Sequence, residues 1–302
     1  MRILVTGSNG LLGQKLVAAL RDDAEVEVIA TSRGEDRTPD PGGYIYLPLD
    51  CTDEAAVHRA FDEVHPDVVI HTAAMTNVDA CELDPINCRL QNVTAVEYLV
   101  RAAKACDAHF IQLSTDFIFD GANGPYKEED EPHPLSIYGQ SKLDAEQVVM
   151  NAGLEKWAIA RTIIVYGVAK GLSRSNVVLW AKGALEKGQP IKVVDDQWRM
   201  PTLAEDLADG CIRIAKRKAI GIFNLCGPDM MSILELVTRV GAFFDLDTSV
   251  ITPITSESLS QPAKRPPRTG FILDKSSREL GYAPRGFEEG LELLKKQFAE
   301  LA

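Results

Sequence analysis

The sequence predicts an α/β protein in which a doubly wound parallel sheet carries a smaller C-terminal lobe. Short apolar runs rich in β-branched residues alternate with stretches of helical periodicity through most of the chain. Near-continuous apolar strands of this kind indicate a parallel sheet that is covered by helices on both faces. A glycine-rich turn directly follows the first run, and the composition changes in the last quarter. A length of 302 residues suits one large α/β unit or two lobes.

The first half of the chain supplies most of the expected sheet. Its strands are expected at 2–7, 26–32, 44–49, 67–73 and 109–115. Helical stretches between most of them lie at 11–21, 54–64 and 85–106. Next come a helix that begins near Tyr138, a strand at 157–167 and a helix at 176–187. A short strand at 191–194, a helix at 204–216 and a strand at 221–227 follow.

The last quarter indicates a second lobe docked on the first. Residues 251–270 are rich in Pro, Ser and Thr, and an amphipathic helix is expected over 287–298. We expect residues 1–165 and about 190–226 to form the sheet domain. Residues of about 166–189, together with 227–302, are expected to form the second lobe.

Charge and composition exclude several functions. The formal net charge of -12 argues against a nucleic-acid surface. No apolar run approaches the roughly 20 residues of a membrane span, and "MRILVTG" enters a strand at once, so we expect a cytoplasmic protein without a signal peptide. The cysteines are scattered without a C-x-x-C spacing, which favours reduced thiols packed as small hydrophobes. They are Cys51, Cys81, Cys88, Cys106, Cys211 and Cys226.

A dinucleotide site is predicted by "TGSNGLLGQ", the turn between the first strand and the first helix. Glycine is required where the chain turns tightly, approaches a phosphate and lets the helix pack on the strand. The helix N-terminus then offers free N–H groups to a pyrophosphate. The spacing is G-x-x-G-x-x-G, so a simple tight turn is the alternative. The expected cofactor contacts of this Rossmann-type turn are Gly7, Asn9, Gly10, Leu11, Leu12 and Gly13.

The end of the second strand favours NADPH as the cofactor, with NADH possible. Ser32 and Arg33 stand there, where an acid would favour NAD and an arginine accommodates a 2′-phosphate. A solvated loop arginine is the alternative. After the third strand, Asp50 and Cys51 are expected near the adenine. Asp50 could equally belong, with Asp53, to the N-cap region of the next helix.

Tyr138 and Lys142 stand four residues apart in "SIYGQSK". On a helix this spacing places both side chains on one face, one turn apart. A phenol beside an ammonium should lose its proton more easily than a free phenol, whose pKa is about 10. The pair therefore predicts either a proton donor in an active site or an ordinary start of an amphipathic helix.

Five segments in order resemble the extended short-chain dehydrogenase/reductase superfamily and, within it, the dTDP-4-dehydrorhamnose reductase family. They are the glycine loop, "HTAAMTNVDACELDP", "STDFIFDG", "YGQSK" and "DDQWRMPT", and a late "KRP" extends the likeness to the end of the chain. The resemblance implies a Rossmann domain with a small C-terminal substrate domain. It also implies reduction of the 4-keto group of a nucleotide-linked deoxysugar, and the superfamily suggests a homodimer.

Carried over residue by residue, the catalytic positions of the family fall on Thr115, Tyr138 and Lys142. Tyr138 would protonate the oxygen of the reduced ketone, and Lys142 would stabilise the phenolate and hold the nicotinamide ribose. Backbone contacts to the cofactor fall on Ala73 and Ala74.

Two positions depart from the family. Arg199 and Met200 follow Trp198 where a glycine is usual, so the identity of the substrate sugar is left open. Gln14 and Lys15 stand where some members carry an acid for an interface metal ion, so we expect no metal.

The nucleotide-sugar should be held by cations and polar groups. "KRPPR" supplies Lys264, Arg265 and Arg268, of which Arg265 matches the arginine of the family. A solvated basic loop is the alternative. Trp198 is expected either to stack on the ligand or to join the core. The expected substrate contacts are Thr76, Asp116, Asn176, Trp198 and Arg265.

Three other functions stay open at this point. A sugar dehydratase would place an acidic pair after the catalytic Thr, whereas Asp116 is followed here by Phe117. An epimerase would share the fold and differ in the substrate pocket. The regulatory subunit of methionine adenosyltransferase also resembles this family, and it binds NADP as a partner protein without being a reductase. The complete Thr115, Tyr138 and Lys142 set favours an enzyme.

Overall fold

The computed structural model describes residues 1–38, 42–172 and 175–301. Within this part of the chain, seven parallel strands form one sheet in the order β11-β6-β5-β4-β1-β2-β3. Their bounds are β1 (Arg2–Thr6), β2 (Glu27–Ser32), β3 (Tyr44–Pro48), β4 (Val68–His71), β5 (His109–Thr115), β6 (Trp157–Thr162) and β11 (Gly221–Asn224). The order reverses after β3, because β4 pairs on the other side of β1. This is the doubly wound α/β fold that the sequence predicts.

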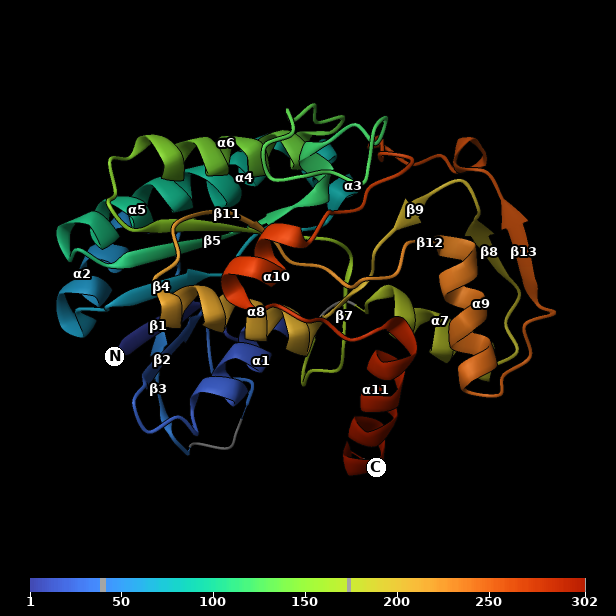
Figure 1. Cartoon of the computed structure of the whole chain (residues 1–302), viewed down its shortest axis with the longest axis horizontal. Helices are drawn as coiled ribbons and strands as arrows, with labels where there is room; N and C mark the ends of the chain where they lie inside the picture. The colour runs from blue at the N-terminus through green and yellow to red at the C-terminus, as the bar shows by residue number, and fades with distance from the viewer. Residues whose placement is uncertain (39–41, 173–174, 302) are drawn as a thin grey trace.

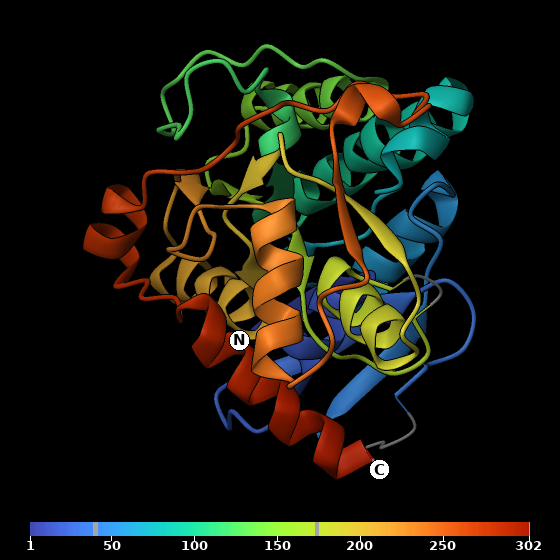
Figure 2. The same ribbon diagram turned by 90° about the vertical axis from the view of Figure 1, so that its right-hand side faces the viewer.

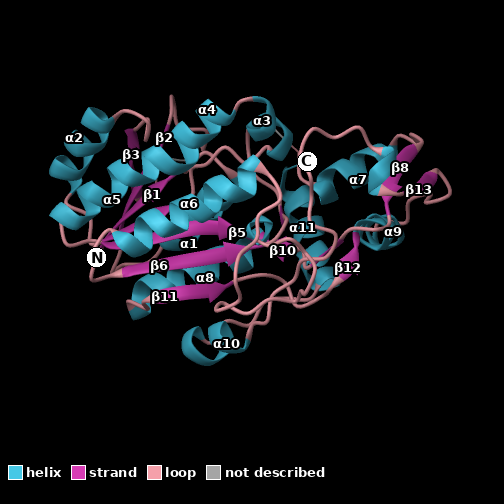
Figure 3. Cartoon of the chain, turned by 90° about the horizontal axis from the view of Figure 1, so that it is seen from above, coloured by secondary structure: helices cyan, strands magenta, loops and turns pink. Residues whose placement is uncertain are grey.

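Helices cover both faces of the sheet (Figures 1 and 3). Side chains of a strand alternate between faces, so Ile3 and Val5 belong to one core and Leu4 to the other. The first core is closed by α1 (Leu11–Leu20) and α8 (Ala204–Arg217). The second is closed by α2 (Glu54–Val64), α5 (Ala95–Ala105) and α6 (Ile137–Asn151).

The helical stretch expected over 85–106 is less regular than its periodicity suggests. After α3 (Val78–Leu83), it consists of α4 (Pro85–Arg89), a π-helical segment η1 (Leu90–Thr94) and α5. The wider π turn lies where Asn92 is buried and donates to Ser141 Oγ at 2.9 Å and to the Met75 carbonyl at 3.0 Å. Such π segments frequently mark functional sites, and this one joins α5 to the loop after β4.

The second lobe lies beside the carboxyl ends of the sheet and has its own apolar core. Its helices are α7 (Val177–Glu186), α9 (Ile233–Phe243) and α11 (Phe287–Leu301), and α10 (Asp274–Leu280) packs near α8 and β11. Figure 2 turns this lobe toward the viewer, with α9 in orange and α11 in red. Three pairs of short strands complete it: β7 (Val165–Tyr166) with β10 (Thr202–Leu203), β9 (Trp198–Arg199) with β12 (Met231–Ser232), and β8 (Ile191–Val194) with β13 (Ile251–Ile254).

Two expectations about this region are corrected. The strand expected over 157–167 is broken, because β6 ends at Thr162, Ile164 has φ of 22°, and β7 pairs with β10 outside the main sheet. The sequence places the short strand 191–194 in the sheet domain. It pairs with β13 instead, and Ile191 and Val193 lie in the core of the second lobe. In the described ranges, no helix is long and apolar enough to cross a membrane.

Candidate active site

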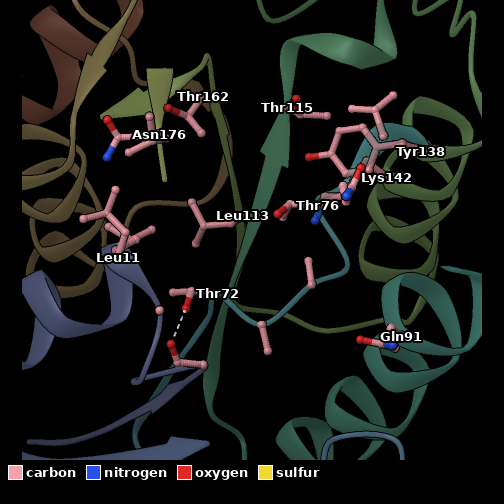
Figure 4. A pocket seen from close by; sticks show the side chains of 18 of the residues that line it. Leu11, Thr72, Thr76, Gln91, Leu113, Thr115, Tyr138, Lys142, Thr162 and Asn176 are labelled. Carbon is pink, nitrogen blue, oxygen red and sulfur yellow. Dashed lines mark hydrogen bonds between the residues drawn. The ribbon is translucent and has the colours of Figure 1, made fainter. Parts of the chain in front are cut away.

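A cavity of about 890 Å³ opens at the carboxyl ends of β1, β4 and β5, between the sheet and the second lobe. Ligands of doubly wound sheets bind at this edge, where the strand order reverses. Figure 4 shows Tyr138, Lys142, Thr76 and Thr115 on one side of it and Leu11 and Asn176 on the other. Every site residue expected from the sequence lines the cavity except Gly13 and Trp198.

The glycine loop packs so closely against its surroundings that side chains at Gly7 and Gly13 would collide with the backbone. Gly7 has φ of +69°, and a Cβ there would lie 2.8 Å from the Ala73 backbone nitrogen. A Cβ on Gly13 would lie 2.3 Å from the Gly7 carbonyl oxygen. Gly13 therefore does not touch the cavity; its missing side chain lets α1 pack against the loop.

The N-terminus of α1 fits a pyrophosphate. Its N-cap residue, Gly10, provides no side chain to satisfy the first N–H groups of the helix. These groups, with the positive end of the helix dipole, favour a bound anion. The residues present thus fit the diphosphate of a dinucleotide cofactor, which Gly7, Gly10, Leu11 and Leu12 would hold.

Two arginines line the end of the cavity that follows β2. Arg33 is one of the expected residues, and Arg37 is one that sequence reasoning missed. The Arg37 backbone N–H donates to Asn9 Oδ1 at 2.9 Å, while its Nη1 donates to the Gly171 carbonyl at 3.0 Å. Asn9 in turn donates to the Glu35 carbonyl at 2.9 Å. Asn9 therefore holds the loop after β2 against the glycine loop and places both arginines at the cavity.

Asp50 and Cys51 lie at the same end. Asp50 Oδ1 accepts from the Thr52 backbone N–H at 2.9 Å and from the Thr52 hydroxyl at 2.7 Å. The N-cap of α2 is Asp53, which accepts from the Ala56 N–H at 3.0 Å. The capping role that the sequence left open thus belongs to Asp53, and Asp50 lies at the cavity wall.

Tyr138 and Lys142 occupy the first turns of α6, one turn apart, on the face toward the cavity. Ser136 begins this helix by accepting from the Gly139 N–H at 3.2 Å. Both side chains are buried, at 8% and 4% exposure. Burial lowers the pKa of Lys142 to about 8, although the Glu146 carboxylate acts in the opposite sense.

The pKa of Tyr138 differs from the sequence-based expectation. Burial raises the pKa of the phenol well above its ordinary value, and this effect outweighs a hydrogen bond with Thr115 that lowers it. The expectation of a more acidic phenol was therefore wrong for this environment, because desolvation penalises the phenolate more than its neighbours stabilise it. A neutral phenol is the form of Tyr138 that can donate a proton.

Thr115 ends β5 beside these two residues, and its hydroxyl is held from two sides. It donates to Asp116 Oδ1 at 3.0 Å and accepts from the Phe117 backbone N–H at 3.3 Å. The ring of Phe117 packs edge-on against Tyr138, with centroids 5.7 Å apart. These contacts fix the hydroxyl and the phenol next to one another.

Asp116 joins the corner formed by Thr115, Tyr138 and Lys142 to the second lobe. It is 1% exposed, and its Oδ2 accepts a hydrogen bond from Thr269. Arg199 lies 3.7 Å from the same oxygen, donates to the Trp198 and Pro266 carbonyls at 2.7 and 2.8 Å, and packs over Phe117. Sequence reasoning noted Arg199 as a departure from the family but did not place it at the cavity wall, where it lies.

The expected residues of the second lobe are Asn176, Trp198 and Arg265. Asn176 caps α7 by accepting from the Leu179 N–H at 3.1 Å, and it donates to the Gly167 carbonyl at 2.7 Å. Trp198 stands outside the cavity lining, half in solvent, with the Arg268 guanidinium 5.5 Å from the centre of its ring. Arg265 lines the cavity in an ion pair with Asp79.

The position expected to lack a metal is occupied by protein contacts. Gln14 accepts from the Lys170 N–H at 2.9 Å and donates to the Lys170 carbonyl at 2.8 Å, while Lys15 pairs with Glu205 at 2.8 Å. Among the described residues there is no group of three or more His, Cys, Asp or Glu side chains that could hold a metal ion.

Fold and site together define a member of the extended short-chain dehydrogenase/reductase class: a doubly wound sheet, a glycine turn suited to a dinucleotide and a Thr-Tyr-Lys corner in one cavity. The chain belongs to the RmlD substrate binding domain family, whose model matches residues 1–300.

Three relatives share this family likeness. Methionine adenosyltransferase 2 subunit beta of Xenopus laevis is 32% identical over 262 residues, which are 85% of this chain and 76% of that protein. The probable low-salt glycan biosynthesis reductase Agl14 of Haloferax volcanii is 31% identical over 306 residues, 99% of each chain. The dTDP-4-dehydrorhamnose reductase of Aggregatibacter actinomycetemcomitans is 30% identical over 306 residues, 96% of this chain and 97% of that one.

Solved structures show the same fold. A dTDP-4-dehydrorhamnose reductase from Clostridium acetobutylicum has a TM-score of 0.86 at 30% identity and covers 99% of this chain and 100% of its own. The Bacillus anthracis enzyme of that name, in complex with NADP, has a TM-score of 0.83 at 25% identity, with 98% and 99% covered.

Proposed function

We propose that the protein is an NADPH-dependent reductase of the 4-keto group of a nucleotide-linked deoxysugar. The observation that carries this proposal is the meeting of Thr115, Tyr138 and Lys142 with the glycine loop in one cavity. Reductases of this kind are among the relatives and the solved structures described above.

The proposed mechanism assigns one task to each side chain. A bound nicotinamide supplies the hydride. Tyr138 donates its phenolic proton to the carbonyl oxygen as negative charge develops there. Thr115 donates to the same oxygen after its hydroxyl proton turns away from Asp116 Oδ1. Lys142 stabilises the phenolate that remains and holds the nicotinamide ribose.

NADPH is the proposed cofactor because Arg33 and Arg37 both line the end of the cavity that follows β2. A guanidinium can bind the 2′-phosphate of NADPH with two parallel hydrogen bonds. NADH lacks this phosphate. NADH would leave these cations without that partner.

A second candidate is an NADP-binding regulatory subunit. It is favoured by the 32% identity to methionine adenosyltransferase 2 subunit beta. In this alternative the cofactor site would be kept for binding, and the Thr115, Tyr138 and Lys142 corner would have no turnover to perform.

Turnover separates the two. The purified protein is mixed with NADPH and a panel of nucleotide-linked 4-keto-sugars, and the nicotinamide absorbance is followed while the products are identified. A reductase consumes NADPH with one of the sugars and gives the reduced sugar. Tight binding of NADPH with a flat trace for every sugar would favour the regulatory subunit, and a product with inverted stereochemistry without net NADPH consumption would indicate an epimerase.

A further inference from the structure

An ion pair joins the two lobes at the wall of the cavity. Asp79, on α3 of the sheet domain, lies opposite Arg265, in the segment between β13 and α10. Arg265 Nη2 is 2.7 Å from Asp79 Oδ2, and the two side chains are 17% and 30% exposed. Both residues line the cavity. The pair therefore lies at the wall of the cavity, with one member from each lobe.

Asp79 also holds the backbone beside Arg265. Its Oδ1 accepts from the Ala263 N–H at 3.3 Å, and Arg265 Nη1 donates to the Ala263 carbonyl at 3.0 Å. One carboxylate thus binds the arginine and the turn that presents it. The Oδ1 contact needs only an acceptor, so an asparagine can keep it, whereas the contact with the guanidinium needs the charge to retain its strength.

The other cations of this region are placed differently. Lys264 and Arg268 are exposed and do not line the cavity in the described part of the chain. Arg199 lines it but is 3% exposed and donates to two backbone carbonyls beside Asp116. Among these cations, Arg265 is therefore the one that a diphosphate in the cavity would meet, and Asp79 already occupies it.

We propose that Asp79 lowers the affinity of the nucleotide-sugar site for its ligand: its carboxylate takes the place of a diphosphate on Arg265 and gives way to that group on binding. This inference rests on the proposed substrate class. A diphosphate that pairs with Arg265 must first displace the Asp79 carboxylate. The two negatively charged groups then lie side by side and repel each other. Asp79 thereby weakens the bound state and returns to Arg265 when the ligand leaves.

A double-mutant cycle tests this by calorimetry on the full chain with NADPH present. The probes are thymidine diphosphate and uridine diphosphate. Asp79→Asn should tighten diphosphate binding about three- to tenfold, the effect of freeing one partly exposed ion pair. Arg265→Met should weaken binding, and in the Arg265→Met background Asp79→Asn should tighten binding by a smaller factor than in wild type, because only the like-charge repulsion is left to relieve.

Two controls separate charge from structure. Uncharged thymidine should bind Asp79→Asn and wild type equally, because it has no phosphate group to pair with Arg265. Asp107→Asn removes a carboxylate that pairs with Lys156 at 2.6 Å far from the cavity, and it should leave diphosphate binding unchanged.

The inference is overturned if Asp79→Asn binds the diphosphates no more tightly than wild type, or if it gains the same factor with Arg265→Met in place. Failure to bind any diphosphate in both wild type and Asp79→Asn would overturn it as well. None of these results depends on turnover. A protein that shows the expected cycle but reduces no keto-sugar would retain this inference and lose the proposed reductase activity.

Discussion

Arg199 and Asp116 form a buried ion pair at the inner end of the cavity, with Nε of the guanidinium 3.7 Å from Oδ2 of the carboxylate. The pair joins the two lobes, because Arg199 belongs to β9 and Asp116 follows β5. Thr115 donates to Asp116 Oδ1 at 3.0 Å. This hydrogen bond connects the ion pair with Arg199 to the residues that are proposed to be catalytic.

Removal of Arg199 should destabilise the fold strongly. Burial raises the pKa of Asp116, while Arg199 and the hydroxyls of Thr269 and Thr115 act in the opposite sense. Arg199→Met leaves the buried carboxylate without its cation, and breaking such a pair costs about 3–5 kcal/mol. Urea unfolding at neutral pH measures this loss.

The matched control is Arg213→Met, which removes a pair with Asp209 that is 37% and 50% exposed and should cost less than about 1 kcal/mol. Adding Asp116→Asn to Arg199→Met should restore part of the stability. If Arg199→Met and Arg213→Met lowered the free energy of unfolding by similar amounts, Arg199 would not be needed to stabilise the buried carboxylate of Asp116.

Tyr138→Phe should separate binding from chemistry. The change keeps the ring and its packing on Phe117 and removes only the hydroxyl that is proposed to donate a proton. We expect kcat for the keto-sugar to fall by about 10²–10⁴, the usual contribution of a positioned general acid. The affinity for NADPH should stay near that of wild type, as measured by quenching of protein fluorescence.

Tyr98→Phe serves as the control for the loss of a hydroxyl, because Tyr98 lies on α5 outside the cavity lining. It should leave kcat unchanged. Keto-sugar reduction by Tyr138→Phe at the wild-type rate would remove Tyr138 from the role of proton donor.

Lys142→Met should abolish activity, weaken NADPH binding and yet stabilise the protein without ligands. Burial lowers the pKa of Lys142 to about 8 from 10.5, so folding at neutral pH must bury a charge that the unfolded chain leaves in water. Burying this charge lowers the free energy of unfolding by about 3 kcal/mol, and the full effect is present below pH 8.

The pH dependence of the unfolding free energy gives a second test of the lowered pKa of Lys142. Between pH 8 and 10.5 the unfolded Lys142 still binds a proton that the folded one has lost, so this group makes stability rise with pH in that window. The difference in unfolding free energy between Lys142→Met and wild type should therefore shrink from pH 7 to 10. A constant difference across that range would mean that Lys142 is charged in the fold throughout.

Arg33→Ala should change the choice of cofactor. Loss of a charge-assisted pair to the 2′-phosphate is worth about 1.5–3 kcal/mol, or roughly ten- to a hundredfold in the Kd of NADPH. NADH, which lacks that phosphate, should bind as it does to wild type. If instead Arg37→Ala has the selective effect and Arg33→Ala has none, the arginine that the sequence singled out would be the wrong one of the two that line the cavity.

Local patterns predicted the elements that the site is built on, because they are short-range properties of the chain. The limits expected for β5 and α2 agree with the structure, and the Tyr138–Lys142 spacing places both side chains on one face of α6. Contacts between distant segments were not predictable in this way. Asp79 and Arg265 are 186 residues apart, and nothing in either segment encodes its partner.

The same limit explains the error in the second lobe. The pattern of 191–194 indicates a strand correctly, but an apolar strand fits either of two cores. Its partner, β13, lies sixty residues further on, in a segment that reads as a loop because it contains Pro253. Likewise Arg37 reads as a loop residue until Asn9 is seen to hold it at the cavity.

The position of β11 at the edge of the sheet has a consequence for the growing chain on the ribosome. β6 is complete at Thr162, yet its neighbour β11 begins only at Gly221, so the nascent sheet presents an open strand edge while the intervening segment is made. The core of the second lobe waits longer still, because it includes Leu291 and Leu294 of α11. A chain stopped before α11 should therefore leave the second lobe without part of its core and unfolded.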